Sequence, residues 1–279
     1  ITHFARISRP GKASVLIFAF TFSSCILYSM LKLVFFLILI ASHFGFAKSR
    51  IMIYGGTGVC EGCADDIAEQ LRAAGYSVDI TNEKNVTLKN LNQYQLYIQP
   101  GGDDVGVVKK ALREQKTSEI HGLEALQKYV KNGGRYLGIC LGGFMADSTL
   151  EDDNTENLHL VAAASKPHFE TLKASMEDVT WNGLENGRDL NILAYYQAGP
   201  EFKKLKSEDW QGDLVTLATY KSNGAAAAVM NSYGQGFAMA LGVHPEATDE
   251  WLKQDHLAPN QTVTKKENQI FLRLIEKLL

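Results

Sequence analysis

The stretch RYLGICLGGF, residues 135–144, indicates the fold of this chain most clearly. Apolar residues run up to Cys140, and glycines stand before and after the cysteine at positions 138, 142 and 143. A strand that ends at a cysteine and turns at once into a helix needs neighbours without a bulky Cβ. The stretch therefore predicts a buried strand, a sharp turn that holds Cys140 at the carboxyl end of that strand, and a helix that begins directly afterwards.

The segments before this stretch alternate between strand and helix patterns. Predicted strands are RIMIYGG (50–56), YSVDIT (76–81) and YQLYIQPGGDD (94–104), and predicted helices cover 63–76 and 120–134. Such alternation favours an α/β fold whose mostly parallel sheet has helices on both faces. Ligands of such sheets bind beyond the carboxyl ends of the strands. We therefore expect the loops 55–63 and 100–104 to lie near Cys140.

The second half of the chain has a different pattern. Extended segments are separated by polar turns, and residues 231–236 (NSYGQG) indicate a hairpin, so this half is predicted to be more antiparallel. The last residues, 264–279, have the spacing of an amphipathic helix. We predict one domain over residues 48–279. The extended segments are LHLVAA (158–163), LNILAYYQAGP (190–200), LVTLATY (214–220), AAAAVMN (225–231) and FAMALGVHPEA (237–247).

Residues 15–47 are almost uninterrupted apolar sequence, unlike the rest of the chain. A start at Met30 would give a short positive region at Lys32, an apolar core and small residues before Lys48, which is the pattern of a signal peptide. We predict a leader over residues 1–47, cleavage after Ala47, no membrane insertion after cleavage, and an exported, periplasmic or secreted protein. The alternative is an uncleaved segment that anchors the protein in a membrane.

Composition excludes several partners. Lys and Arg number 28 against 31 Asp and Glu, for a net charge of −3 without a basic stripe, so nucleic acid is not a predicted partner. The glycine-rich loop after the first strand lacks the lysine of a phosphate-binding loop, and the histidines lack metal-ligand spacing. We predict no metal and no cofactor. The expected ligand is a small molecule or a peptide, and the sequence does not set the oligomeric state.

A base for Cys140 is found near the end of the last predicted strand. His244 and Glu246 lie two residues apart, so strand alternation places both side chains on the same side. Thiol chemistry needs a base that takes the proton and a carboxylate that orients the base. Cys140, His244 and Glu246 are therefore predicted to form a catalytic triad.

The motifs GICLGG and GVHPE resemble those of the class I glutamine amidotransferase superfamily, over roughly residues 50–246. Within it, YGGTGV, QPGGDD, YLGICLGGFMA and YYQAGP are most similar to the biotin-protein ligase N-terminal domain-like family. The resemblance implies a flavodoxin-like sheet and the Cys-His-Glu order of the triad. No motif of a ligase catalytic domain accompanies these residues, so biotin transfer is not predicted.

One departure from the superfamily concerns the substrate. Members that use glutamine typically have a Gln after the turn that holds the cysteine, where this chain has Gly143-Phe144. An exported protein also lacks a cytoplasmic synthase to consume ammonia. We therefore predict a hydrolase of an amide or peptide bond of unknown identity. The alternative is a non-catalytic protein that uses the same pocket to bind a small molecule or to respond to redox conditions.

Other residues are candidates for the pocket. Backbone N–H groups of Leu141 and of Gly101 or Gly102 would hold the oxyanion, unless the Gly-Gly pair is only a turn. Tyr196 and Gln197 would wall the pocket, or else pack within their strand.

CEGC, residues 60–63, allows three interpretations. It could be a redox motif at a helix start, a local disulfide, or a loop in which Cys63 caps Cys140 and switches it off. Glu61 could hydrogen-bond Cys140 or be a solvated loop acid.

Overall fold

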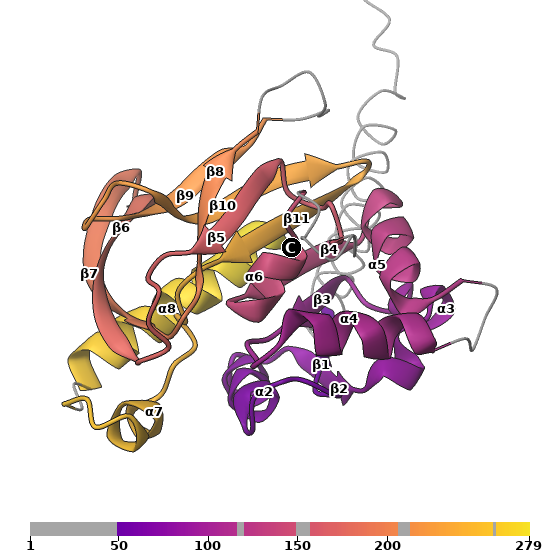
Figure 1. Cartoon of the computed structure of the whole chain (residues 1–279), viewed down its shortest axis with the longest axis horizontal. Coiled ribbons are helices and arrows are strands. Elements are labelled where there is room, and N and C mark those ends of the chain that lie inside the picture. Colours follow the sequence, from indigo (N-terminus) through magenta and orange to yellow (C-terminus); the bar gives the residue numbers. More distant parts are fainter. Residues whose placement is uncertain (1–48, 116–119, 149–156, 206–212, 259–260) are drawn as a thin grey trace, which may run out of the picture. The chain divides into compact units, whose positions relative to one another are not determined.

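An eleven-stranded sheet forms the centre of the protein, with strand order β2-β1-β3-β4-β11-β10-β9-β6-β7 and with β8 and β5 attached at β10 (Figure 1). The structure is a computed structural model that describes residues 49–115, 120–148, 157–205, 213–258 and 261–279. The predicted leader, residues 1–47, lies outside the described residues. Among the described residues, no helix has the length and apolar character needed to cross a membrane.

The first part of the sheet is parallel. It comprises β1 (Arg50–Tyr54), β2 (Ser77–Thr81), β3 (Leu96–Gln99) and β4 (Arg135–Ile139), and β11 (Gly236–Leu241) joins it in parallel to β4. β1, β3 and β4 are buried over nearly their whole length because both of their faces are covered, whereas the edge strand β2 is mostly exposed.

Helices cover both faces of this parallel part. Side chains of β1 alternate, so that Ile51 and Ile53 pack with one group of helices and Met52 and Tyr54 with the other. The first group is α2 (Cys63–Ala73) and α8 (Gln261–Leu278), and the second is α4 (Val105–Glu114), α5 (Gly122–Lys131) and α6 (Leu141–Met145). Shorter helices are η1 (Glu83–Asn85), α3 (Leu88–Leu91) and α7 (Asp249–Gln254).

The rest of the sheet is antiparallel and lies on the far side of β11 (Figure 1). Its longest hairpin pairs β6 with β7, and α8 packs against this region. The strands are β5 (Ala163–Pro167), β6 (Ser175–Glu185), β7 (Arg188–Tyr196), β8 (Pro200–Lys204), β9 (Val215–Tyr220) and β10 (Ala226–Tyr233). β11 therefore joins the parallel and antiparallel parts.

The predicted α/β sheet with helices on both faces is confirmed. One predicted extended segment is wrong in most of its length, because residues 158–162 are not a strand. The backbone N–H groups of Leu158 and Leu160 donate instead to the carbonyls of Met145 and Ala146 at the end of α6. Their apolar side chains are thereby buried beside that helix, and the strand begins only at Ala163.

Candidate active site

Cys140 has the backbone geometry of a nucleophile elbow. It lies between β4 and α6 with φ 52° and ψ −105°, in a region that L-residues rarely adopt. The flanking glycines are required by close packing. A Cβ on Gly138 would lie 2.1 Å from the carbonyl oxygen of Gly142, and one on Gly142 would lie 2.2 Å from that of Gln99. The turn predicted from the sequence is present.

Neighbouring strands bring His244 to Cys140. The N–H of Cys140 donates to the carbonyl of Leu241, the last residue of β11, over 2.8 Å. His244 follows shortly after this strand, and its side chain hydrogen-bonds the Cys140 thiol. The other ring nitrogen, Nδ1, lies 2.8 Å from Oε1 of Glu246. The structure thus brings together all three residues of the predicted triad.

The charges of this buried cluster favour a protonated histidine. Burial alone would lower the pKa of His244, but the carboxylate of Glu246 and the hydrogen bond and charge of Cys140 together raise the pKa to about 10. The side chain of His244 is 5% exposed and that of Glu246 is fully buried. Water therefore screens the pair weakly, and the imidazolium form of His244 is favoured beside the Glu246 carboxylate.

Residues far apart in the sequence hold Glu246 in place. Gln70, from α2, donates to the backbone carbonyl of Glu246 over 2.6 Å. Asn268, from α8, donates to the side-chain oxygen of Gln70 and to the carbonyl of Ala247. The helices of one face thus fix the segment that carries the base. No sequence motif marks these contacts, so they were not predicted from the sequence.

Two aromatic rings beside His244 were also missed. The ring centroids of Tyr195 and Trp251 lie 5.7 and 5.5 Å from that of His244, both edge-on. The Tyr195 hydroxyl donates to Asp255 over 2.5 Å, and burial together with this carboxylate raises the pKa of Tyr195. These rings shield the imidazole from water. Tyr195 precedes the predicted Tyr196 by one residue, so strand alternation was the signal that could have found it.

The loops after β1 and β3 meet at the cysteine, as expected for the carboxyl edge of the sheet. A Cβ on Gly101 would lie 2.9 Å from Cε1 of His244, 3.5 Å from Sγ of Cys60 and 3.7 Å from Cβ of Cys140. Gly102 pairs with Val59 in an isolated β-bridge. Gly101 therefore lies against Cys140 and His244. The oxyanion role of Gly101, Gly102 and Leu141 stays a prediction.

Tyr196 and Gln197 have different positions. The backbone carbonyl of Gln197 accepts a hydrogen bond from the Cys140 thiol at 3.5 Å, so this residue borders Cys140. Tyr196 is fully buried, and its hydroxyl donates to the carbonyl of Gly199 while accepting from the N–H of Phe169. Tyr196 thus has the packing role that the sequence left open.

Cys60 and Cys63 form a disulfide at the start of α2, with their Cα atoms 5.6 Å apart. Of the three interpretations of this motif, the structure has the local disulfide. Cys140 is free and buried, so in this state Cys63 does not cap it. Glu61 is exposed in the same loop. Within the described ranges, no group of three or more Cys, His, Asp or Glu side chains is arranged to hold a metal ion.

The fold, with a cysteine on a sharp turn between β4 and α6, is similar to that of solved class I glutamine amidotransferases. Residues 49–169 match the family described as "Biotin-protein ligase, N terminal". The resemblance to that family drawn from the sequence is thereby confirmed over these residues, and the fold agrees with the resemblance to class I glutamine amidotransferases. No curated protein matches the chain.

Solved structures with similar folds match a larger part of this chain than the family does. The structure of PurLQS from Thermotoga maritima has a TM-score of 0.56 and 18% identity, and the match covers 83% of this chain and 100% of the other. A glutamine amidotransferase from Thermotoga maritima has a TM-score of 0.56 and 15% identity, covering 82% and 97%. A cytoplasmic protein from Salmonella typhimurium has a TM-score of 0.52 and 14% identity, covering 82% and 98%. At these identities the likeness shows the fold.

Proposed function

We propose that the protein is a cysteine-dependent hydrolase of an amide or peptide bond, with Cys140 as nucleophile, His244 as base and acid, and Glu246 as the orienting carboxylate. One observation carries the proposal: a cysteine at positive φ whose thiol hydrogen-bonds a histidine that is itself paired with a buried carboxylate. Backbone strain and a buried carboxylate both cost stability. Such costs are typical of functional sites.

The reaction would begin with attack of the Cys140 thiolate on the carbonyl carbon of the substrate. The developing oxyanion would bind backbone N–H groups. That of Leu141, the residue after Cys140, is suited to this role because the first N–H groups of a helix have no acceptor within the helix. The imidazolium of His244 would then donate its proton to the leaving amine. A water molecule, deprotonated by His244, would finally hydrolyse the thioester and release the acid.

Glu246 supports this cycle by its position. Its Oε1 lies 2.8 Å from Nδ1 of His244, which directs Nε2 of the ring toward the thiol. The carboxylate also stabilises the positive charge that His244 carries before amine departure. Hydrolysis is favoured over ammonia transfer because Gly143-Phe144 replaces the Gln of glutamine-using relatives. With its predicted leader cleaved, the protein would meet this substrate outside the cytoplasm.

The test is the rate at which iodoacetamide alkylates Cys140 across pH, measured by peptide mapping of the protein from Lys48 onward. We expect fast alkylation well below the free-thiol pKa of ~8.5, and slower alkylation in His244→Ala. His256→Ala, which removes an exposed histidine, is the matched control. Slow alkylation that does not depend on His244 would overturn the triad. Amide and peptide libraries would then be screened by intact mass for an acyl group on Cys140.

A second candidate function is ligand binding without turnover. The observation that favours it is the tight packing of the site, since Cys140 is 7% exposed and aromatic rings cover His244. Such a protein would bind library members reversibly without forming an acyl adduct. Equilibrium binding measured beside intact mass separates the two functions.

A further inference from the structure

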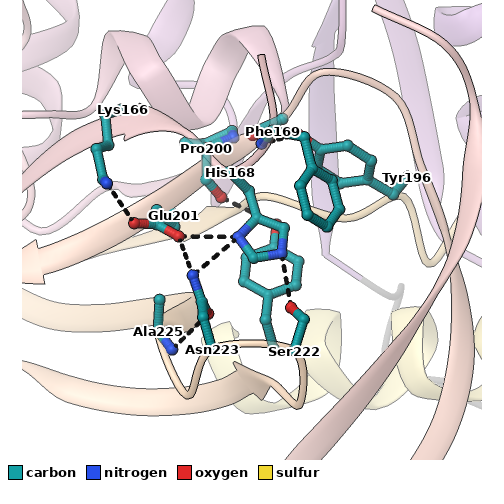
Figure 2. A network of polar contacts seen from close by, with 11 residues as sticks. Lys166, His168, Phe169, Tyr196, Pro200, Glu201, Ser222, Asn223 and Ala225 are labelled. Atoms are coloured by element: carbon teal, nitrogen blue, oxygen red, sulfur yellow. Dashed lines mark hydrogen bonds and ion pairs between the residues drawn. The ribbon is translucent and has the colours of Figure 1, made fainter. Parts of the chain in front are cut away.

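A second histidine-centred network lies in the antiparallel part of the sheet, outside the Cys140 site (Figure 2). His168 directly follows β5, Glu201 belongs to β8, and Ser222 lies in the turn between β9 and β10. Because these residues are far apart in the sequence, no motif joins them. Figure 2 shows the imidazole of His168 between the carboxylate and the hydroxyl.

The distances are those of a Ser-His-acid triad. Nε2 of His168 lies 3.0 Å from Oγ of Ser222, and Nδ1 lies 2.8 Å from Oε2 of Glu201. A carboxylate can only accept, so in the neutral imidazole Nδ1 carries the proton and Nε2 accepts from the serine hydroxyl. This tautomer is the one that a general base needs.

Glu201 is held as a carboxylate. Burial would raise its pKa, but hydrogen bonds from His168, Lys166 and Asn223 lower the pKa of Glu201 to about 2. Nζ of Lys166 lies 3.0 Å from Oε1, and Nδ2 of Asn223 lies 2.7 Å from Oε2. Asn223 Nδ2 is 3.5 Å from Nδ1 of His168, a longer contact than the one to the carboxylate. The acid is therefore ionised and fixed in orientation.

Aromatic rings fix the imidazole while the serine stays accessible. The ring of His168 stacks on Tyr220 with centroids 3.6 Å apart, and the ring of Phe169 lies against it at 4.1 Å. The side chain of His168 is 1% exposed, whereas Ser222 is exposed at the turn. Among the described residues, the N–H groups of Ser222 and Asn223 have no acceptor. They are thus available to bind an oxyanion beside Oγ.

We propose that Ser222 is the nucleophile of a second, serine-based site that takes carboxylic esters, with His168 as base and Glu201 as orienting acid. His168 Nε2 takes the hydroxyl proton as Oγ attacks the ester carbonyl carbon. The C–O bond to the alcohol then breaks, and the alcohol leaves with the proton from His168. Water, deprotonated by His168, hydrolyses the acyl-serine to release the carboxylic acid and restore Ser222.

Esters suit this site better than amides. Ser222 lies on an exposed turn, where water competes for the N–H groups that would hold the oxyanion. An alcohol leaves more readily than an amine, so the ester reaction needs less help from the site. The site shares no residue with the Cys140 triad, and its test is independent of the proposed amide hydrolysis.

The test is labelling of the full chain with a fluorophosphonate, a reagent for activated serines, followed by peptide mapping. We expect a phosphonyl group on Ser222, no label at this position in Ser222→Ala, and labelling at least ~100-fold slower in His168→Gln. Ser77→Ala, which removes another exposed serine, is the matched control. Mapping separates Ser222 from Cys140.

Labelling of Ser222 no faster than that of Ser77 in the unaltered protein would overturn the proposal, and would leave the network as a link between the β9–β10 turn and β8. This comparison needs no variant, so it stands even where His168→Gln folds poorly. Thermal unfolding of each variant is recorded beside the labelling. Glu201→Gln, which keeps the size of the side chain, provides a second probe of the base and should also slow labelling.

Discussion

At the level of single residues, the backbone of Cys140 stores strain. Its φ of 52° brings Cβ close to backbone atoms in any residue except glycine. Loss of the thiol should therefore have different effects on stability in two variants. We expect Cys140→Gly to unfold with a free energy about 1 kcal/mol higher than Cys140→Ala, because glycine adopts this conformation without penalty. Urea unfolding measures the difference, and equal stability would contradict strain at the elbow.

The charge of His244 gives a second prediction at this scale. Its pKa is raised from 6.5 to about 10, so the imidazolium form persists through neutral pH and is lost only as the pH rises through about 10. The stability that this raised pKa contributes is complete below pH 6.5 and is lost as the pH rises through about 10. An NMR titration should show the Cε1–H resonance of His244 unchanged between about pH 5 and 8. A shift centred near pH 6.5 would contradict the buried ion pair.

At the level of elements, α8 places a buried carboxyl behind the site. Oε1 of Glu267 accepts from the N–H of Tyr195 over 2.7 Å, and Oε2 has no partner among the described residues. Burial, and to a lesser extent the charge of Glu246, raise the pKa of Glu267 to about 8, against the opposing effects of the Tyr195 N–H and His244. The helix therefore carries a carboxyl that is mostly neutral at pH 7.

This raised pKa predicts a loss of stability with rising pH. Between pH 4.5 and about 8 the unfolded chain releases the proton of Glu267 while the folded chain keeps it, so the free energy of unfolding falls across this window. Glu267→Gln keeps the acceptor for Tyr195 and removes the titration. We expect the variant to be more stable than the unaltered protein at pH 8, by on the order of 2 kcal/mol, with the gain shrinking toward pH 5.

Chemical unfolding at several pH values measures this gain. Glu276→Gln, which changes an exposed carboxyl of the same helix, is the control and should leave the pH dependence unaltered. A Glu267→Gln protein whose stability follows that of the unaltered protein at every pH would show that this carboxyl does not titrate differently on folding.

For the molecule as a whole, resistance to acid should depend on Glu201. This residue joins β8 to the end of β5 and to the β9–β10 turn through His168 and Asn223. Its pKa is lowered to about 2, so its contribution to stability is complete above about pH 4.5 and is lost as the pH falls through about 2. Glu201→Gln should be less stable at pH 7, and the difference should shrink toward pH 2. A difference that stays constant across this range would contradict the shift.

Much of this fold could be predicted from the sequence, because all the parallel strands except β2 are largely apolar runs followed closely by glycines. RYLGICLGGF also specifies the elbow, since Gly138 and Gly142 meet backbone atoms that leave no room for a Cβ. The antiparallel part was less predictable. Leu158 and Leu160 have the alternation of a strand, yet their backbone bonds to the end of α6, a tertiary contact that local pattern does not encode.

The residues of the candidate site were likewise predictable from the sequence only in part. Cys140, His244 and Glu246 could be found because each lies within a short motif at or shortly after a strand end, although β11 ends at Leu241 and the predicted strand alternation does not reach His244 and Glu246. The supports of Glu246 could not, because Gln70 and Asn268 come from two helices that are far apart in the sequence. The network of His168 is built entirely from such long-range contacts, and only the folded chain brings it together.

The position of β11 has a consequence for how such a protein can evolve. β4 and β11 are neighbours in the sheet, but the whole antiparallel part of the chain lies between them in sequence. A single parallel pairing therefore sets the spacing of thiol and imidazole. Insertions and deletions in the intervening segment can remodel the surroundings of the cysteine while that spacing is kept. Selection can thus alter what the protein recognises separately from the reactive pair.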